Sequence, residues 1–237
     1  MKNINISKEE FYLMQLADSF FPSGTFGMSG GLESFVKNGK IKNEKDVLMF
    51  LEQQLVLRVI PCDCIILSTI IDAAKKDDIV IAMFIDNAFY SMKLIKEIRV
   101  ASVRSGQQIL NCVLYMSSAY RKNKFAKKFM SNIENKKTAG TYPACLGISA
   151  HCLGIKKESA IRIMLYSYSV SIAAAALRMG IIQHLSAQKI LAMVSSDTNI
   201  NIKSIGEKSI NDVWQLTPSA DVLQMLHEHE DIKMFIT

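Results

Sequence analysis

The sequence contains few of the residues that interrupt helices or favour strands. Only 4 prolines and 1 tryptophan occur among 237 residues, whereas 13 methionines and many isoleucine, leucine and alanine residues are present. Proline breaks helix interiors, and large aromatic residues favour strands. No two-residue hairpin signal and no internal repeat is found. This balance favours an all-helical protein, and the length suits one domain with a sizeable core.

Targeting and membrane signals are also missing. The first five residues lack the apolar region of a signal peptide, and the five cysteines are an odd number. We therefore expect reduced thiols in the cytoplasm. The longest uncharged run, residues 163–177, is shorter than the roughly 17–25 residues of a membrane span and carries three serines. We expect this run to form a buried helix, and we expect no membrane partner.

Motifs for phosphate binding and hydrolysis are absent from the sequence. There is no G-x-x-x-x-G-K-S/T loop, no H-E-x-x-H and no G-x-S-x-G. Without a loop that can cradle phosphates, the chain is not expected to bind or hydrolyse GTP. We predict that the protein is not an enzyme, that it has no catalytic residue and that it carries no cofactor.

The cysteines do not have the spacing of a structural zinc site. Cys62 and Cys64 form a C-x-C pair, and Cys145, His151 and Cys152 lie far along the chain. Structural zinc sites usually show paired C-x₂₋₄-C spacings, whereas free cysteine commonly packs as a small apolar residue. We predict buried cysteines and no metal site. A weak, transient metal contact at Cys62 and Cys64 stays open.

The histidines near the end of the chain do not form an obvious metal site either. His227 and His229 flank Glu228. On a helix, residues two apart point in different directions, so the two imidazoles would not share a face. We therefore expect a surface or interface role for this segment.

Charge is unevenly distributed along the chain. The formal net charge is +6, with a basic cluster at Arg121, Lys122, Lys124, Lys127 and Lys128. Such a cluster usually marks a solvated face, and the functional alternative is an acidic partner or nucleic acid. Few aromatic residues interleave these charges, which weakens the nucleic-acid reading. We expect no nucleic-acid partner.

Local signals predict a series of helices. Ser7 and Glu10 form a capping box, Asn43 is a good helix N-cap, and Pro61 is expected to end the helix that Asn43 begins. Further helices are expected over 63–74, 78–90, up to about 104, 107–120, 143–151, 156–179, 186–194 and 219–229, with a loop over 195–208. We predict one all-α domain, residues 1–237, built as a bundle of about ten helices. We expect its C-terminal segment, residues 195–237, to be mobile.

A glycine-rich stretch lies between the first two predicted helices. Residues 22–33 read P-S-G-T-F-G-M-S-G-G-L-E, with four glycines and a proline. Glycine allows backbone angles and close approaches that a Cβ forbids, and a plain helix–helix connection needs far fewer such residues. We therefore expect this stretch to bring two parts of the backbone, or a partner, close together.

This stretch resembles the N-terminal signature of the UreF family of urease accessory proteins, P-x-G-x-F-x-x-S-x-G-L-E. Four further elements resemble that family in the same order along the chain. They are Arg99, Ser102, Arg104 and Gly106; Tyr142, Pro143 and Gly147; the small-residue helix 165–178; and Pro218, Asp221, His227 and Glu228. The chain departs from the family pattern at Met28, and its end carries Lys233 and Phe235 in place of the usual arginine-containing tail.

The resemblance implies a non-enzymatic assembly factor for nickel urease. UreF-like proteins are all-α homodimers that bridge a UreD/UreH-type accessory protein and the GTPase UreG, and the complex delivers nickel to apo-urease. The residues that the resemblance points to for partner binding are Pro22, Gly24, Phe26, Gly31, Glu33, Arg99, Arg104, His227 and Glu228. The alternatives from the residues alone are a helical metal carrier that uses Cys62 and Cys64, or a basic nucleic-acid binder.

Overall fold

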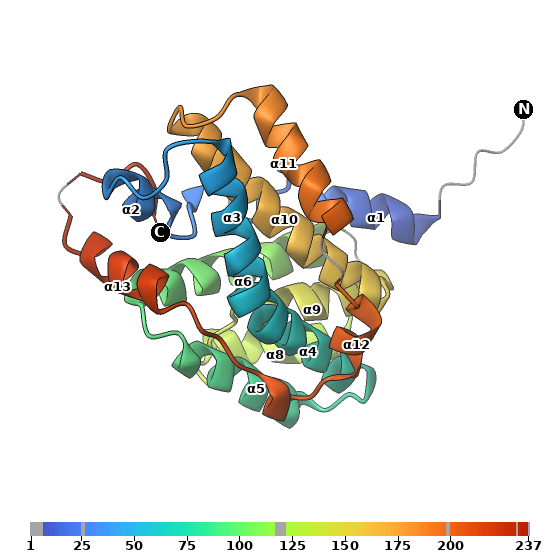
Figure 1. Ribbon diagram of the computed structural model, residues 1–237. Helices are drawn as coiled ribbons and strands as arrows, with labels where there is room; N and C mark the ends of the chain where they lie inside the picture. The colour runs from blue at the N-terminus through green and yellow to red at the C-terminus, as the bar shows by residue number, and fades with distance from the viewer. Residues whose placement is uncertain (1–6, 25–26, 117–121, 198–199, 231, 237) are drawn as a thin grey trace, which may run out of the picture.

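The computed structural model describes residues 7–24, 27–116, 122–197, 200–230 and 232–236 (Figure 1). Within these ranges the chain forms helices and no strand, so the predicted all-α single-domain fold is confirmed. In chain order the elements are α1 (Lys8–Ala17), α2 (Leu32–Lys37), α3 (Glu44–Gln54), the π-helix η2 (Leu55–Cys64), α4 (Ile65–Lys75), α5 (Ile79–Met92), α6 (Lys96–Met116), α8 (Lys124–Glu134), α9 (Tyr142–Leu153), α10 (Lys157–Arg178), α11 (His184–Asp197), α12 (Ile202–Glu207), the 3₁₀ turn η3 (Ile210–Asp212) and α13 (Pro218–His227).

Helix α9 lies at the centre of the bundle. It packs against α4 on one side and α6 on the other, and residues 143–150 are all buried. Helix α10 contacts α1, α4, α9 and α11, so it links the outer helices to this centre. Elements from the two ends of the chain lie together, because α2 packs against α13 (Figure 1). The N-terminal glycine-rich turn and the C-terminal segment therefore share one side of the molecule.

Several helix ends follow from local sequence signals. The capping box of Ser7 and Glu10 is present, and the side chains of Asn43 and Asp78 each accept a hydrogen bond from the first turn of a helix. Helix α9 begins with Pro143 in its first turn and ends at Gly154, which has φ +71°. These ends were predicted, and they are confirmed.

The expectation that Pro61 ends a helix is wrong. The chain stays helical from Glu44 to Lys75, with Pro61 inside η2. Proline has no N–H, so residue 61 makes no helical hydrogen bond, whether to Val56, as in a π-helix, or, as in an α-helix, to the carbonyl oxygen of Leu57. The backbone N–H of Leu216 donates to that oxygen at 2.9 Å, and the N–H of Trp214 donates to the Pro61 oxygen at 3.1 Å. A distant segment thus satisfies carbonyl groups beside the proline, and the helix continues.

Two other boundaries differ from expectation. The two helices expected around residue 105 form one helix, α6, and Gly106 within it lets the helix approach another chain segment closely. A Cβ at Gly106 would come within 2.5–2.6 Å of backbone atoms of Thr141. The predicted loop over 195–208 contains a helix, α12, which Asn201 caps.

Asp86 joins α5 to the loop before α9 from inside the core. It is fully buried, and its carboxylate accepts hydrogen bonds from the Thr138 hydroxyl at 2.6 Å and the Gly140 N–H at 2.6 Å. The N–H and the hydroxyl of Thr141 donate to its other oxygen at 2.9 and 2.6 Å. Four donors replace the water that this carboxylate loses on burial.

The structure also shows where the cysteines and the basic cluster lie. Cys62, Cys64 and Cys145 are buried, and the other two cysteines are half-buried. Helix α8 points Phe125 and Phe129 into the core and exposes its lysines, which is the solvated face expected there; Arg121 lies outside the described residues.

Two helical stretches, Glu44–Lys75 and Lys157–Arg178, are long and apolar enough for a membrane span, but core helices pass the same test.

Candidate functional site

The glycine-rich turn places Glu33 inside the molecule, against the C-terminal segment. Gly31 has φ +94° and immediately precedes α2. A Cβ at Gly31 would overlap the side-chain amide of Gln224 on α13, so the close packing of these two elements requires glycine there. Glu33, in the first turn of α2, is only 3% exposed. The turn therefore delivers a carboxylate into the contact between the two ends of the chain.

The Glu33 carboxylate binds the backbone of the C-terminal tail. The N–H groups of Met234 and Phe235 donate to its two oxygens at 2.9 and 3.0 Å. Lys37, one helical turn later, lies 2.9 Å from one oxygen, and His227 lies 3.3 Å from the other. Burial acts to raise the pKa of Glu33, but these hydrogen bonds outweigh it and lower the pKa below its ordinary 4.5.

His227 lies between two carboxylates. Its Nε2 faces Glu33 at 3.3 Å and its Nδ1 faces Glu97 at 2.8 Å, and the side chain is 1% exposed. The imidazole ring of His227 thus bridges α2 and α6 through its two nitrogens. His227 is therefore buried and does not lie on the surface, and the interface role expected for residues 227–229 remains a prediction.

Further ion pairs surround this contact. Lys233 donates to Glu97 at 2.6 Å and to the carbonyl oxygen of Glu228 at 3.2 Å. Burial acts to raise the pKa of Glu97, but the contacts with Lys233 and His227 lower it overall. The Glu228 carboxylate accepts from the backbone N–H of Glu97 at 3.1 Å, near the start of α6, where a negative charge is favourable. We call Glu33, Lys37, Glu97, His227 and Lys233 the Glu33 cluster.

The end of the chain is fixed by further contacts. Phe235 is buried, and its ring lies 4.3 Å from the guanidinium carbon of Arg178 at the end of α10. The N–H of Ile236 donates to the carbonyl oxygen of Gly27 in the glycine-rich turn at 2.9 Å. In this structure the C-terminal tail is docked. The mobility expected for residues 195–237 remains a prediction.

The structure brings together some of the residues expected to bind partners. Gly31, Glu33, His227 and Glu228 all meet at the Glu33 cluster or beside it. Pro22 and Gly24 are exposed in the same turn, and Phe26 lies outside the described residues. Arg99 donates to the carbonyl oxygens of Lys93 and Leu94 at 2.6 and 2.8 Å, so it stabilises the start of α6. Arg104 is exposed one and a half turns further along that helix.

Sequence reasoning missed three members of this region. Lys37 follows Glu33 by four residues, a spacing that predicts an ion pair on a helix, so this contact had a local signal. Glu230, which pairs with Lys37 at 2.5 Å, and Gln224, which packs on Gly31, come from the other end of the chain. No local pattern connects them to the glycine-rich turn.

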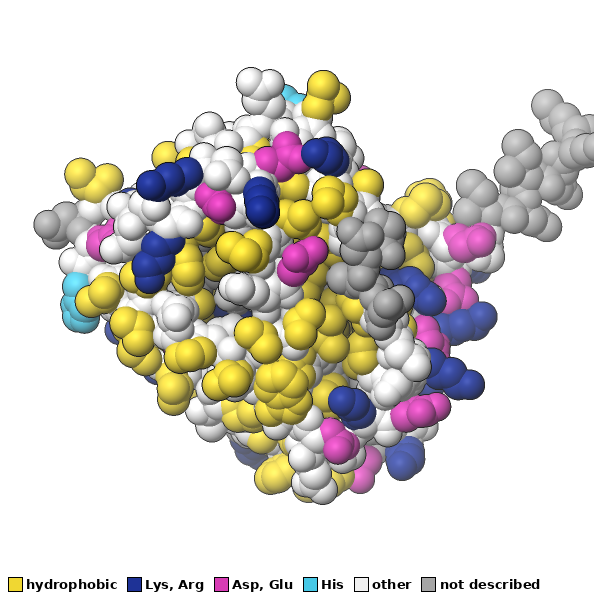
Figure 2. Space-filling view, viewed as in Figure 1, with side chains coloured by type: hydrophobic (Ala, Val, Ile, Leu, Met, Phe, Trp, Pro, Cys, Tyr) yellow, Lys and Arg dark blue, Asp and Glu magenta, His cyan; other side chains and the backbone are white. Residues whose placement is uncertain are grey.

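An apolar surface adjoins the cluster. Hydrophobic side chains gather on the face that carries α3, α13 and the segment between η3 and α13 (Figure 2). The exposed apolar residues on these elements and at the start of η2, which we call the apolar face, are Met49, Val56, Trp214, Leu216, Val222, Met225 and Leu226, each between 41% and 61% exposed. Exposed apolar areas of this kind commonly mark protein–protein contacts. The face is suited to a protein partner.

The described residues offer no evident metal site. They contain no group of three or more His, Cys, Asp or Glu side chains arranged to hold an ion. Burial raises the pKa of Cys62 to about 11 and that of Cys64 well above 9.0. A thiol must lose its proton to bind a metal, so both cysteines are poor ligands in this conformation.

The comparisons with known proteins agree on one family. A sequence model of the UreF family matches residues 41–195. "Urease accessory protein UreF" of Trichodesmium erythraeum (strain IMS101) is 29% identical over 235 residues, which cover 99% of each chain. "Urease accessory protein UreF 1" of Brucella melitensis biotype 1 is 28% identical over 95% of this chain and 91% of its own. The chain therefore belongs to the UreF family of non-enzymatic urease accessory proteins.

Proposed function

We propose that this protein is a cytoplasmic scaffold for urease maturation. It bridges a UreD/UreH-type accessory protein and the GTPase UreG, and the complex supports nickel insertion into apo-urease. Family membership supports a role with other urease maturation proteins. The structural observation that carries the proposal is the apolar face beside the docked C-terminal tail, since a scaffold acts by presenting surfaces.

The energy available at this face is enough for a specific contact. Burying one large apolar side chain contributes roughly 1.5–3 kcal/mol, so a few of them can offset the ordering cost of association. The face includes a partly exposed tryptophan, Trp214, and an exposed leucine, Leu226. Tryptophan is enriched among residues that dominate binding energy at protein interfaces.

We assign the apolar face to the UreD/UreH-type partner and propose that its binding protects the C-terminal segment. The tail contacts Glu33, Lys37 and Gly27, so a partner on α13 would stabilise both ends of the chain together. Hydrogen exchange of the free protein and the complex tests this coupling. Equal, strong protection of residues 219–230 in both states would contradict it.

The protein is also proposed to form a homodimer. Phe20 and Tyr115 are 92% and 81% exposed and line a groove of about 600 Å³ between the end of α1 and the end of α6. Aromatic residues of this kind favour protein–protein contacts. A monomer in sedimentation experiments at micromolar concentration would argue against this part of the proposal.

The assignment of the apolar face is tested by a matched pair of variants. Leu226→Asp places a charge on the exposed part of α13, whereas Leu185→Asp makes the same change on α11, at another side of the fold (Figure 1). We expect Leu226→Asp to abolish co-purification with the UreD/UreH-type protein and to lower urease activation at least tenfold. Leu185→Asp should retain both, and both variants should melt like the parent protein.

Two results would overturn the proposal. Full urease activation by the Leu226→Asp variant would exclude the apolar face as the partner site. A normal yield of active, nickel-loaded urease in cells that lack this protein, but have the other accessory proteins, would exclude the function itself.

Deletion of residues 217–237 should abolish complex formation while the rest of the bundle stays helical.

A further inference from the structure

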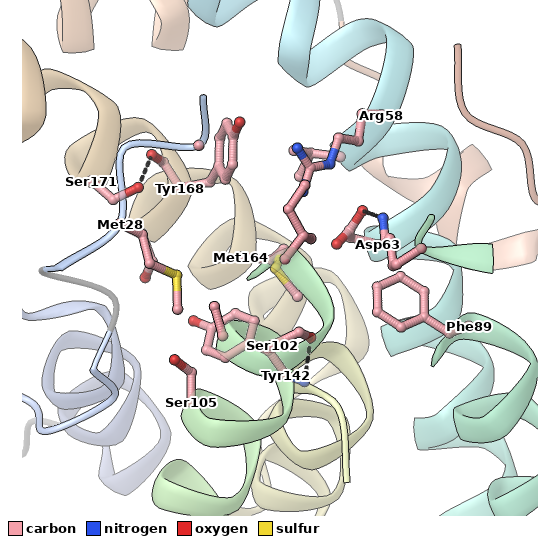
Figure 3. Close-up of a pocket in the computed structure, with 16 residues that line it drawn as sticks. Met28, Arg58, Asp63, Phe89, Ser102, Ser105, Tyr142, Met164, Tyr168 and Ser171 are labelled. Carbon is pink, nitrogen blue, oxygen red and sulfur yellow. Dashed lines mark hydrogen bonds and ion pairs between the residues drawn. The ribbon is translucent and has the colours of Figure 1, made fainter. Parts of the chain in front are cut away.

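A small, mainly apolar cavity with a few polar side chains lies behind the glycine-rich turn, between η2, α6 and α10 (Figure 3). Its volume is about 90 Å³, and its walls include Met28, Arg58, Ser105, Met164 and Tyr168. Since one water molecule occupies about 30 Å³ in the liquid, this space holds about three waters or one molecule of a few heavy atoms. The cavity is independent of the apolar face and of the Glu33 cluster.

Arg58 provides an unpaired charge in this cavity. The residue is 8% exposed, and its Nη1 has no hydrogen-bond partner among the described residues. No carboxylate oxygen in the described part of the chain lies within 4.0 Å of its guanidinium, although Asp63 and Asp221 act on it from further away. A buried charge without a direct partner is unfavourable by several kcal/mol. The site is therefore short of one negative group.

The nearest carboxylate is engaged elsewhere. Asp63 pairs with Lys93 at 3.1 Å, as the dashed line in Figure 3 shows. Lys93 also donates to the side-chain oxygen of Gln215 at 2.9 Å, so its charge is already solvated by the protein. Asp63 and Lys93 satisfy each other, and Arg58 is left to bind whatever enters the cavity.

Two hydroxyl groups in the cavity also lack partners. Ser105 is 1% exposed, and neither its Oγ nor the buried Oη of Tyr168 makes a hydrogen bond within the described residues. The wall near Tyr168 is glycine for a steric reason, because a Cβ at Gly30 would lie 2.9 Å from that Oη. The Arg58 guanidinium and the Tyr168 hydroxyl thus supply unused donors at one end of the cavity, and Ser105 lies at the other end (Figure 3).

The backbone that carries Arg58 is unusual. It lies in η2, a π-helix of 10 residues, whereas π-helical turns are rare in proteins and are frequent at functional sites. The wider turn continues through Pro61 and directs Arg58 toward α10 (Figure 3). The geometry of the cavity is thus built into the main chain, and side-chain choice alone would not produce it.

We propose that this cavity binds a small oxyanion, such as a carboxylate or inorganic phosphate, through the Arg58 guanidinium and the hydroxyl of Tyr168. Guanidinium N–H groups and oxyanion lone pairs match in geometry, and a charged hydrogen bond of this kind is about twice as strong as a neutral one. The anion neutralises Arg58 and accepts from the Tyr168 hydroxyl. No bond is made or broken in this step.

The proposal is tested with acetate and acetamide, two molecules of the same shape that differ in charge. Full-length protein is titrated with each ¹³C-labelled compound at constant ionic strength, and binding is followed by saturation-transfer NMR. We expect saturable binding of acetate and none of acetamide. Arg58→Met should weaken acetate binding at least tenfold, whereas Arg162→Met, which removes an exposed arginine on α10, should not change it.

Inorganic phosphate, titrated in competition with acetate, identifies the anion class. Displacement of acetate by phosphate supports a general oxyanion site, and no displacement supports a site restricted to carboxylates. Equal binding of acetate and acetamide, or unchanged acetate binding in Arg58→Met, would overturn the proposal and leave a water-filled cavity. If Arg58→Met does not fold, Tyr168→Phe tests the same site and should weaken acetate binding about tenfold.

Discussion

The backbone N–H of Leu216 donates a hydrogen bond to the carbonyl oxygen of Leu57 at 2.9 Å. Residue 61, which would donate to that oxygen in an α-helix, is a proline and has no N–H. The hydrogen bond from Leu216 thereby attaches the segment before α13 to a core helix, one turn before the proline. Pro61 thus helps to position the exposed residues Trp214 and Leu216 of the apolar face.

Pro61→Ala should loosen this attachment. The new N–H at position 61 competes for the Leu57 oxygen, so the bond from Leu216 is weakened by about 1 kcal/mol, and exchange of the Leu216 amide should rise about fivefold. Hydrogen exchange measured by NMR checks the result. Pro143→Ala, at the first turn of α9, is the control and should not change that rate. Unchanged exchange at Leu216 in Pro61→Ala would contradict the explanation.

Gly31 should tolerate a side chain less well than another glycine of similar conformation. Gly31 and Gly154 both have positive φ, so alanine is strained at both, but only at Gly31 would its Cβ overlap Gln224. We expect Gly154→Ala to cost about 1 kcal/mol and Gly31→Ala at least twice as much in denaturant unfolding. Gly31→Val should be worse still, with loss of urease activation.

A second substitution separates backbone strain from overlap with Gln224 as causes of that loss. Gln224→Ala removes the overlapping amide, so it should restore part of the stability of Gly31→Ala and none of that of Gly154→Ala. Strictly additive effects of Gly31→Ala and Gln224→Ala would show that the contact between the turn and α13 does not matter.

Docking of the C-terminal tail should be lost in acid. The pKa values of Glu33 and Glu97 in the folded protein lie below the ordinary 4.5, despite burial, because of their hydrogen bonds. A depressed carboxyl pKa contributes stability that is fully present above pH 4.5 and is lost as the pH falls through the folded value. Protection of the Phe235 amide from hydrogen exchange, which reports tail docking, should therefore fall as the pH is lowered below 4.5.

Variants of Glu33 test the origin of this pH dependence. Glu33→Gln should reduce protection of Phe235 at neutral pH and flatten its loss in acid, since the carboxylate that binds the tail is absent. Glu134→Gln, an exposed change at the end of α8, should leave both unchanged. The same acid profile in Glu33→Gln as in the parent would refute the assignment.

Asp86→Asn should destabilise the whole fold. The amide of asparagine would direct a donor toward groups that already donate, including the Thr138 hydroxyl and the Gly140 N–H. We expect a loss of about 3 kcal/mol in the free energy of unfolding. Asp77→Asn is the matched control, because Asp77 is exposed with φ +53°, a conformation that asparagine also adopts. A loss below 1 kcal/mol for Asp86→Asn would contradict this role.

The parts of the fold that the sequence predicts are those with local causes. Helix starts at Asn43 and Asp78 and the stop at Gly154 depend on contacts within a few residues, and the structure has them as expected. Pro61 was misread because its effect depends on Leu216, 155 positions later, which supplies the missing donor. A prediction based only on residues close in sequence cannot include that hydrogen bond.

The candidate site shows the same division. The glycine-rich turn and Glu33 are visible in the sequence, because their pattern is dense and resembles a family signature. Their partners are not, since Glu33 binds backbone N–H groups that every residue but proline carries. Arg58 could not be recognised from the sequence either, because an arginine in an apolar helix can be exposed, and only the structure shows that this one is buried.

The contact between Glu33 and Phe235 sets an order of events during protein synthesis. These residues are 202 positions apart, and a ribosome adds about 5–20 residues per second, so roughly 10–40 s pass between them. During that time the glycine-rich turn has emerged without the segment that binds its carboxylate. This corner of the fold is therefore completed only after Phe235 has been synthesised, and until then the nascent chain has an open N-terminal region that chaperones can bind.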